Sequence, residues 1–221
     1  MKFIDIHTHR SSLENGVISI FNLFINESEK LNKLESSVSV SFHPWFIDEQ
    51  SIPEIIDVIP TFLNNNCLAI GECGLDNVKN QNFAIQLEVF EKLIQISEEV
   101  KKPMIIHCVK AFNEMIKLRT DNHCKQSWVF HRFSGSKQIA EQLIQQNCYL
   151  SFGEHLISNI KLQRLFIDIP MNSIFFETDD SDISISKIYQ KAAELKQISK
   201  EEMKRIVFNN YMNLFPDADR K

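Results

Sequence analysis

The chain has 221 residues, of which 43% are hydrophobic and 24% charged, and a formal net charge of -5 at pH 7. This composition is typical of a folded domain and excludes an intrinsically disordered chain, and a total of five glycines argues against a loop-rich all-β or collagen-like protein. The acidic balance gives no overall basic footprint, so tight, sequence-independent binding to duplex nucleic acid is not indicated. Nucleic acid stays open as a substrate, because bound divalent cations reverse the sign of the charge in a cleft.

Eight apolar runs predict strands, and several are continuously apolar, as in strands that are buried on both faces. These runs cover residues 2–7, 17–24, 37–43, 67–75, 103–109, 127–133, 148–153 and 173–179. Helical patterns lie between most of them. The predicted helices cover residues 51–63, 82–100, 136–146 and 198–215.

Local signals support the ends of these helices. Ser136 and Ser199 are the predicted N-caps of the last two, and Glu202 completes a capping-box spacing with Ser199. Pro60 should kink or break the first.

Strands that alternate with helices favour a parallel α/β fold, and eight of them favour a compact, somewhat irregular (β/α)₈ TIM-type barrel. The segment between the first two strands, residues 10–16, is too short for a full helix. A doubly wound open sheet is the alternative, but the chain has no G-x-G-x-x-G or Walker-type loop. No linker or repeat divides the sequence, so we expect a single domain over residues 1–221.

The five cysteines form no C-x-x-C pair and adjoin apolar runs, which predicts free thiols in a reducing compartment. Asp5 and His7 interrupt the first apolar run, which is shorter than a signal peptide requires, and no run approaches the length of a membrane span. We therefore expect a cytoplasmic protein with no membrane partner. The sequence indicates no obligate protein partner.

The stretch FIDIHTH, residues 3–9, ends in two histidines spaced by one residue. Alternate side chains of a strand share a face, so His7 and His9 should project together, with Asp5 on the same face. Two adjacent imidazoles form half of a metal site, because neutral imidazole nitrogen is a common ligand. On this stretch alone, a pair of surface histidines is the alternative.

Four further candidates lie toward the C-terminal ends of predicted strands: Glu72, His107, His131 and Asp179. The carboxyl ends of barrel strands converge on one face, where barrel enzymes have their active sites. A carboxylate between two cations, with imidazoles on each side, would form a two-metal centre that activates water and holds both oxygens of a displacement reaction.

Five segments in a fixed order resemble the TatD family of metal-dependent hydrolases. They are HTH at 7–9, GECGLD at 71–76, PMIIHC at 103–108, HRFSG at 131–135 and ETD at 177–179. The resemblance implies a barrel with two divalent metal ions per chain. It also implies hydrolysis of phosphodiester bonds, as a 3′ to 5′ exodeoxyribonuclease on single-stranded DNA.

The resemblance also implies a role for each residue. His7 and His9 would hold one cation, and His107 with His131 the other. Glu72 would bridge the two cations, and Asp179 would bind the first metal's water and act as general base. Mixed histidine and carboxylate ligands suit zinc, manganese or iron, and magnesium can act where carboxylates and waters dominate.

Other residues have two interpretations each. His43, which ends a predicted strand, would contact phosphate or orient a metal ligand, or is a buried structural histidine. Asp76 would orient a metal ligand or begin the following turn. His155 is a candidate for substrate contact, and Trp45 would stack on a base or pack locally.

The sequence departs from the family at two places. The family usually has a basic residue at the position of Val109, so Lys110 or Arg132 would bind the phosphate instead. Asp180 and Asp182 follow ETD, where the family has a small residue and proline. These departures keep open a hydrolase of a small phosphoester, ester or amide. A non-catalytic scaffold is a third alternative, against which the presence of all six expected ligands argues.

Overall fold

The computed structural model describes residues 1–10, 15–27, 37–48, 51, 53, 66–79 and 82–216. The chain divides into two compact units. The first unit contains Met1–Phe21 and His131–Lys221, and the second contains Asn22–Phe130. The prediction of a single domain stays a prediction.

All eight predicted strands are confirmed. They are β1 (Phe3–Thr8), β2 (Val17–Phe24), β3 (Ser37–Phe42), β4 (Cys67–Asp76), β5 (Met104–Val109), β6 (Trp128–Phe130), β7 (Cys148–Phe152) and β8 (Ile174–Phe176). They follow one another in chain order in the sheet, and the described pairings are parallel. This is the topology of a (β/α)₈ barrel, so the predicted fold class is confirmed.

The strands β6 and β8 are shorter than predicted, with three residues each. The chain leaves the extended conformation soon after each of them, since Arg132 has φ 43° and Asp179 has φ 52°. Positive φ is incompatible with a regular strand. The predicted site residues His131 and Asp179 therefore lie on turns that follow strands.

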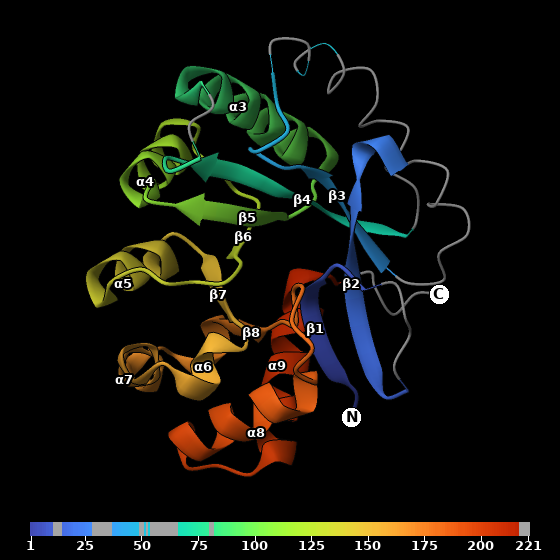
Figure 1. Ribbon diagram of the computed structural model, residues 1–221, viewed down its shortest axis with the longest axis vertical. Coiled ribbons are helices and arrows are strands. Elements are labelled where there is room, and N and C mark those ends of the chain that lie inside the picture. The colour runs from blue at the N-terminus through green and yellow to red at the C-terminus, as the bar shows by residue number, and fades with distance from the viewer. Residues whose placement is uncertain are drawn as a thin grey trace. The chain divides into compact units, whose positions relative to one another are not determined.

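In the first unit, β1 pairs with β2, β7 pairs with β8, and an isolated bridge joins Thr8 to Asp179. The helices of this unit are α5 (Lys137–Gln145), α6 (His155–Ser158), α7 (Ile160–Asp168), α8 (Ile185–Lys196) and α9 (Lys200–Leu214), with a 3₁₀ turn, η2 (Met171–Ser173). Both α8 and α9 lie beside β1 (Figure 1). The buried Tyr189 hydroxyl of α8 accepts a hydrogen bond from Ile4 N (3.1 Å) and donates one to Ile4 O (3.0 Å).

In the second unit, β3 to β6 pair in chain order. The 3₁₀ turn η1 (Ile25–Glu27) follows β2, α3 (Phe83–Val100) packs along β4, and α4 (Phe112–Asp121) follows β5 (Figure 1). Gly71 and Gly74 have φ of 141° and 145°, and a Cβ atom on either would overlap the carbonyl oxygen of a residue on β5. The close approach of β5 therefore requires glycine on both sides of Glu72.

Three predicted helices are confirmed as α3, α5 and α9. Ser136 accepts a hydrogen bond from Ile139 N at the start of α5, and Ser199 accepts one from Glu202 N at the start of α9. The predicted helix at 51–63 lies almost entirely outside the described residues. The predicted ranges do not include α4, α6, α7 and α8.

The five cysteines are free. Burial raises the pKa of Cys67 to about 11, so this thiol is protonated at neutral pH. None of the helices in the described part of the chain combines the length and the hydropathy that a membrane crossing requires.

Candidate active site

The first cluster consists of His7, His9 and Asp179, and all three belong to the first unit. The Oδ1 atom of Asp179 lies 3.6 Å from Nε2 of His7 and 3.3 Å from Nε2 of His9. The backbone fixes this arrangement, because Asp179 N donates to His7 O and His9 N donates to Asp179 O, both at 3.0 Å. The structure thus brings together the three residues that were predicted for the first cation.

Asp5 supports the first cluster without joining it. Its Oδ1 accepts a hydrogen bond from Thr178 N at 2.9 Å, and its Oδ2 accepts one from the Thr178 hydroxyl at 2.6 Å. Burial raises the pKa of Asp5 to about 7, although the bonds from Thr178 act in the opposite direction. Asp5 therefore ties β1 to the segment that carries Asp179.

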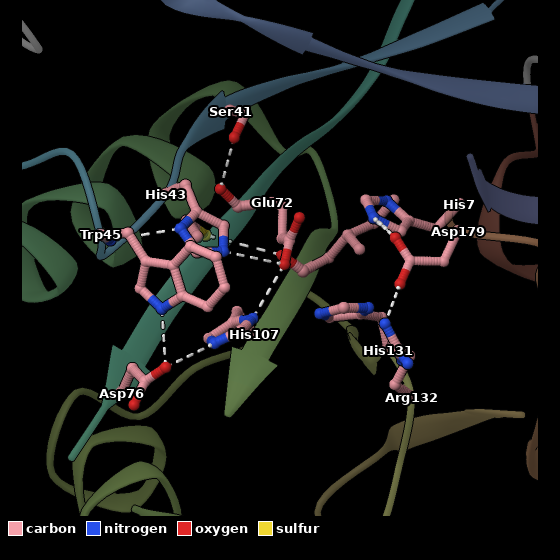
Figure 2. Close-up of polar contacts among 12 residues, drawn as sticks. His7, Ser41, His43, Trp45, Glu72, Asp76, His107, His131, Arg132 and Asp179 are labelled. Carbon is pink, nitrogen blue, oxygen red and sulfur yellow. Dashed lines mark hydrogen bonds and ion pairs between the residues drawn. The ribbon is translucent and has the colours of Figure 1, made fainter. Parts of the chain in front are cut away.

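A guanidinium group contacts the carboxylate of the first cluster (Figure 2). Arg132 Nη1 donates to Asp179 Oδ2 at 2.8 Å, and Arg132 Nη2 lies 3.2 Å from His155 Nε2. Burial disfavours the charged form of Arg132, but Asp179, Asp180 and Glu177 outweigh it and raise its pKa. Arg132 is therefore a permanent cation at the edge of the cluster.

Glu177 is a buried residue of this site to which the sequence analysis assigns no role, although it begins the ETD segment. Its Oε1 accepts a hydrogen bond from Arg132 N at 2.6 Å and lies 3.6 Å from Nδ1 of His131. Its Oε2 is buried without a hydrogen-bond partner among the described residues. The His131 ring in turn lies 4.8 Å from the His7 ring. Glu177 therefore positions two residues of the site.

The second cluster consists of His43, Glu72 and His107, all buried and all in the second unit (Figure 2). Glu72 Oε1 lies 3.2 Å from His43 Nε2 and 2.8 Å from His107 Nδ1. Glu72 and His107 are predicted ligands. His43 lies with them, where the sequence analysis expects a phosphate contact, an orienting role or a structural role. The signal that could have identified it is its position at the end of a predicted strand, which it shares with the other candidates.

Asp76 holds the second cluster from outside. Its Oδ2 accepts a hydrogen bond from Trp45 Nε1 at 2.7 Å and lies 3.2 Å from His107 Nε2, while its Oδ1 accepts from the backbone N of Val78 and Lys79. Burial opposes the charged form, but these hydrogen bonds outweigh it and lower the pKa of Asp76 to about 2. Both interpretations of Asp76 therefore describe its contacts, since it orients His107 and stabilises a turn.

Neighbouring strands fix the backbone of Glu72. Its N donates to Asn22 Oδ1 on β2 at 2.8 Å, and its O accepts from the Ser41 hydroxyl on β3 at 2.8 Å. Trp45 packs locally. Its ring centroid lies 4.8 Å from that of the His43 ring and 3.4 Å from Lys79 Nζ.

The donor chemistry of both clusters fits a divalent cation. Each cluster offers two imidazoles and one carboxylate, with ligand atoms within 4.8 Å of one another. Such mixed nitrogen and oxygen donors suit zinc, manganese or iron. His131 belongs to the first unit and His107 to the second, so their shared cation stays a prediction. Lys110, which is a predicted phosphate contact, directly follows β5 and is exposed.

Comparison with known proteins places the chain in a family. A profile of the TatD related DNase family matches residues 13–216. A metal-dependent hydrolase of Methanocaldococcus jannaschii, itself uncharacterized, is 25% identical over 85% of this chain and 78% of its own length. Deoxyribonuclease TATDN3 of Homo sapiens is 28% identical over 76% of this chain and 69% of its own length. The crystal structure of the TatD homolog YJJV from Escherichia coli K12 matches with a TM-score of 0.84 at 19% identity, over 97% of this chain and 98% of that one.

Proposed function

Because this chain belongs to the TatD family of metal-dependent hydrolases, we propose that it cleaves phosphodiester bonds and removes nucleotides from the 3′ end of single-stranded DNA. The observation that carries the proposal is the contact between Arg132 and Asp179. In this contact a guanidinium, a group that can bind phosphate, lies against a carboxylate, a group that can accept a proton. The name of the human relative, a deoxyribonuclease, supports the choice of substrate.

We place one divalent cation at each cluster. When bound, the cations would lower the pKa of a water molecule and neutralise charge on the phosphate oxygens. In this proposal, His7 and His9 bind the first cation together with Asp179, and His43 and His107 bind the second together with Glu72. The bridging role that the family resemblance implies for Glu72 stays a prediction.

The carboxylate of Asp179 accepts the proton of the attacking water in the proposed reaction. As the water oxygen bonds to phosphorus, the bond from phosphorus to the 3′ oxygen of the preceding nucleotide breaks, and that oxygen takes a proton from solvent. The Oδ1 atom faces the two imidazoles and Oδ2 contacts Arg132, so the carboxylate is held in one orientation.

Arg132 takes the place of the basic residue that the family usually has at the position of Val109. Its planar guanidinium can donate two parallel hydrogen bonds to a phosphate, which the point charge of lysine cannot do. Lys110 is exposed, whereas Arg132 contacts the carboxylate of the first cluster, so Arg132 is the better candidate for the phosphate contact.

A time course with a 5′-labelled single-stranded DNA oligonucleotide tests the proposal. The protein is assayed with magnesium, with manganese and with EDTA, and its metal content is measured in parallel. We expect a metal-dependent ladder that shortens from the 3′ end. An intact oligonucleotide from protein that contains metal would overturn the nuclease assignment.

A hydrolase of small phosphoesters is the second candidate. It is favoured by Asp180 and Asp182, because added acid near the site repels a polyanion. Asp182 pairs with Arg10, Asp180 Oδ1 lies 3.6 Å from Arg132 Nη1, and both acidic side chains are largely exposed. Hydrolysis of bis(p-nitrophenyl) phosphate beside an intact oligonucleotide would select this candidate.

A further inference from the structure

We propose that a basic pocket beside Arg132 binds the phosphate backbone of the nucleotides next to the scissile bond. The pocket has a volume of about 590 Å³ and lies wholly within the first unit, between the segment 132–137 and the segment that carries α6 and α7. This volume is within the range of small-molecule sites. The inference rests on the proposed phosphodiesterase function and adds to it a binding site for the part of the DNA strand that is not cleaved.

The charge of the pocket is opposite to that of the protein. Although the chain has a net charge of -5, the charged residues that line this pocket are four cations and two carboxylates. The cations are Arg132, Lys137, Lys161 and Arg164, and the carboxylates are Glu154 and Asp168. A concave surface of one sign concentrates ligands of the opposite sign, so the pocket favours an anion.

The two carboxylates already have partners. Asp168 accepts a hydrogen bond from Lys137 Nζ at 2.8 Å, and Glu154 Oε2 accepts one from the Ser181 hydroxyl at 2.5 Å. Lys161 and Arg164, in contrast, are exposed and have no ion pair within the described part of the chain. They provide the charge that a phosphate can use.

The positions of these two cations suit a polyanion. Lys161 and Arg164 are three residues apart in the first half of α7, so they project from the same face of the helix. Two cations in a row match successive phosphates better than a single small anion. The N-terminal end of α5, nine residues long, adds positive potential to the opposite wall.

Arg132 connects the pocket to the candidate active site. Its Nη1 contacts Asp179 of the first cluster, while its Nη2 lies 3.2 Å from His155 Nε2, and both Arg132 and His155 line the pocket. A strand whose scissile phosphate lies at Arg132 therefore has its neighbouring phosphates directed toward Lys161 and Arg164. A small phosphoester would not reach them.

The test compares two double variants with the same loss of charge. Lys161→Gln with Arg164→Gln removes the two free cations of the pocket, and Lys187→Gln with Lys191→Gln removes two lysines of α8 as a control. The substrates are a 20-nucleotide single-stranded DNA and the p-nitrophenyl ester of thymidine 5′-phosphate. Binding of the labelled oligonucleotide is also measured by fluorescence anisotropy in EDTA, at several salt concentrations.

We expect the pocket variant to raise the Kd and KM for the oligonucleotide about tenfold, and to reduce the slope of log Kd against log salt by about 1.4, since each phosphate contact on a single strand contributes roughly 0.7. The loss of kcat/KM should be larger for the oligonucleotide than for the ester. Equal losses of kcat/KM on both substrates, or an effect no larger than that of the control variant, would overturn the proposal that the pocket binds DNA.

The failure of the nuclease assignment has a different signature. If the wild-type protein cleaves no oligonucleotide but binds it through Lys161 and Arg164, the pocket is supported and the nuclease reaction is not. If the wild-type protein cleaves the oligonucleotide and the pocket variant matches the control, the pocket alone is wrong.

Discussion

The two clusters have the same ligand chemistry and different surroundings. Each has two imidazoles and one carboxylate, but Glu72 in the second cluster is buried with its imidazoles, whereas Asp179 in the first cluster also contacts Arg132. In the first cluster the side chain of His9 is 28% exposed. We therefore expect the second cluster mainly to hold a cation, and the first also to contact the substrate.

The carboxylates that support the two clusters, Asp5 and Asp76, differ in their hydrogen-bond donors and in their pKa. Asp5 behind the first cluster accepts hydrogen bonds from Thr178 and from the backbone of His7, which are neutral donors, and burial raises its pKa to about 7. Asp76 behind the second cluster accepts bonds from Trp45 and from two backbone N–H groups and contacts His107, and its pKa falls to about 2. Asp5 is more deeply enclosed by protein than Asp76 and accepts fewer hydrogen bonds, and both differences favour its protonated form.

Among the substitutions that test the difference between the two clusters, Glu72→Gln should have the largest effect on activity. The amide has no negative charge to hold a cation between His43 and His107, so we expect loss of metal and a fall in kcat of about 1000-fold or more. Metal analysis and single-turnover kinetics measure both effects. Glu88→Gln on the exposed side of α3 is the control. Retention of metal together with activity within tenfold of wild type would contradict the assignment.

The next effect is expected for Asp179→Asn. The side-chain oxygen can still face the imidazoles, but the amide cannot accept the proton of water, so we expect kcat to fall about 100- to 1000-fold while much of the metal remains. Steady-state kinetics with metal analysis test this, and Asp121→Asn at the end of α4 is the control. Full activity of the Asp179 variant would show that the general base is another group.

A smaller effect is expected for His43→Asn, which separates two interpretations of this residue. As a ligand of the second cluster, its loss should weaken metal affinity by about 10- to 100-fold. His123→Asn, at an exposed turn with φ 50°, is the matched control because asparagine tolerates positive φ. If the metal stays bound and KM alone rises, His43 contacts the substrate instead.

The smallest effect in this series is expected for Glu177→Gln. The amide oxygen preserves the acceptor for Arg132 N, but the buried Oε2 becomes an N–H donor, so we expect kcat to fall about tenfold and stability to fall by about 1–2 kcal/mol. Thermal melts and kcat of Glu177→Gln and Glu177→Ala distinguish two roles. If Glu177 is only structural, both variants lose Tm and keep the wild-type kcat below their melting temperatures.

Local patterns in the sequence were sufficient for the eight strands, for the helices α3, α5 and α9, and for most of the candidate ligands. Buried strands have apolar runs, Ser136 and Ser199 cap helices through bonds that span three residues, and ligands follow strands because strand ends meet at one edge. These signals lie within short stretches of chain, so they can be read without the structure. The grouping of His7 and His9 with Asp179 came from the resemblance to the TatD family.

The groups that contact these candidate metal ligands could be identified only from the three-dimensional structure. The bond between Arg132 and Asp179 joins residues 47 positions apart, and the bond between Asp5 and Thr178 joins residues 173 apart. The place of His43 beside Glu72, the role of Glu177 and the basic pocket depend on similar contacts. Such contacts arise from the packing of distant segments, which leaves no local periodicity in the sequence. The fold class and most of the candidate metal ligands were therefore predictable from the sequence, whereas the packing of distant segments fixes how each carboxylate is held.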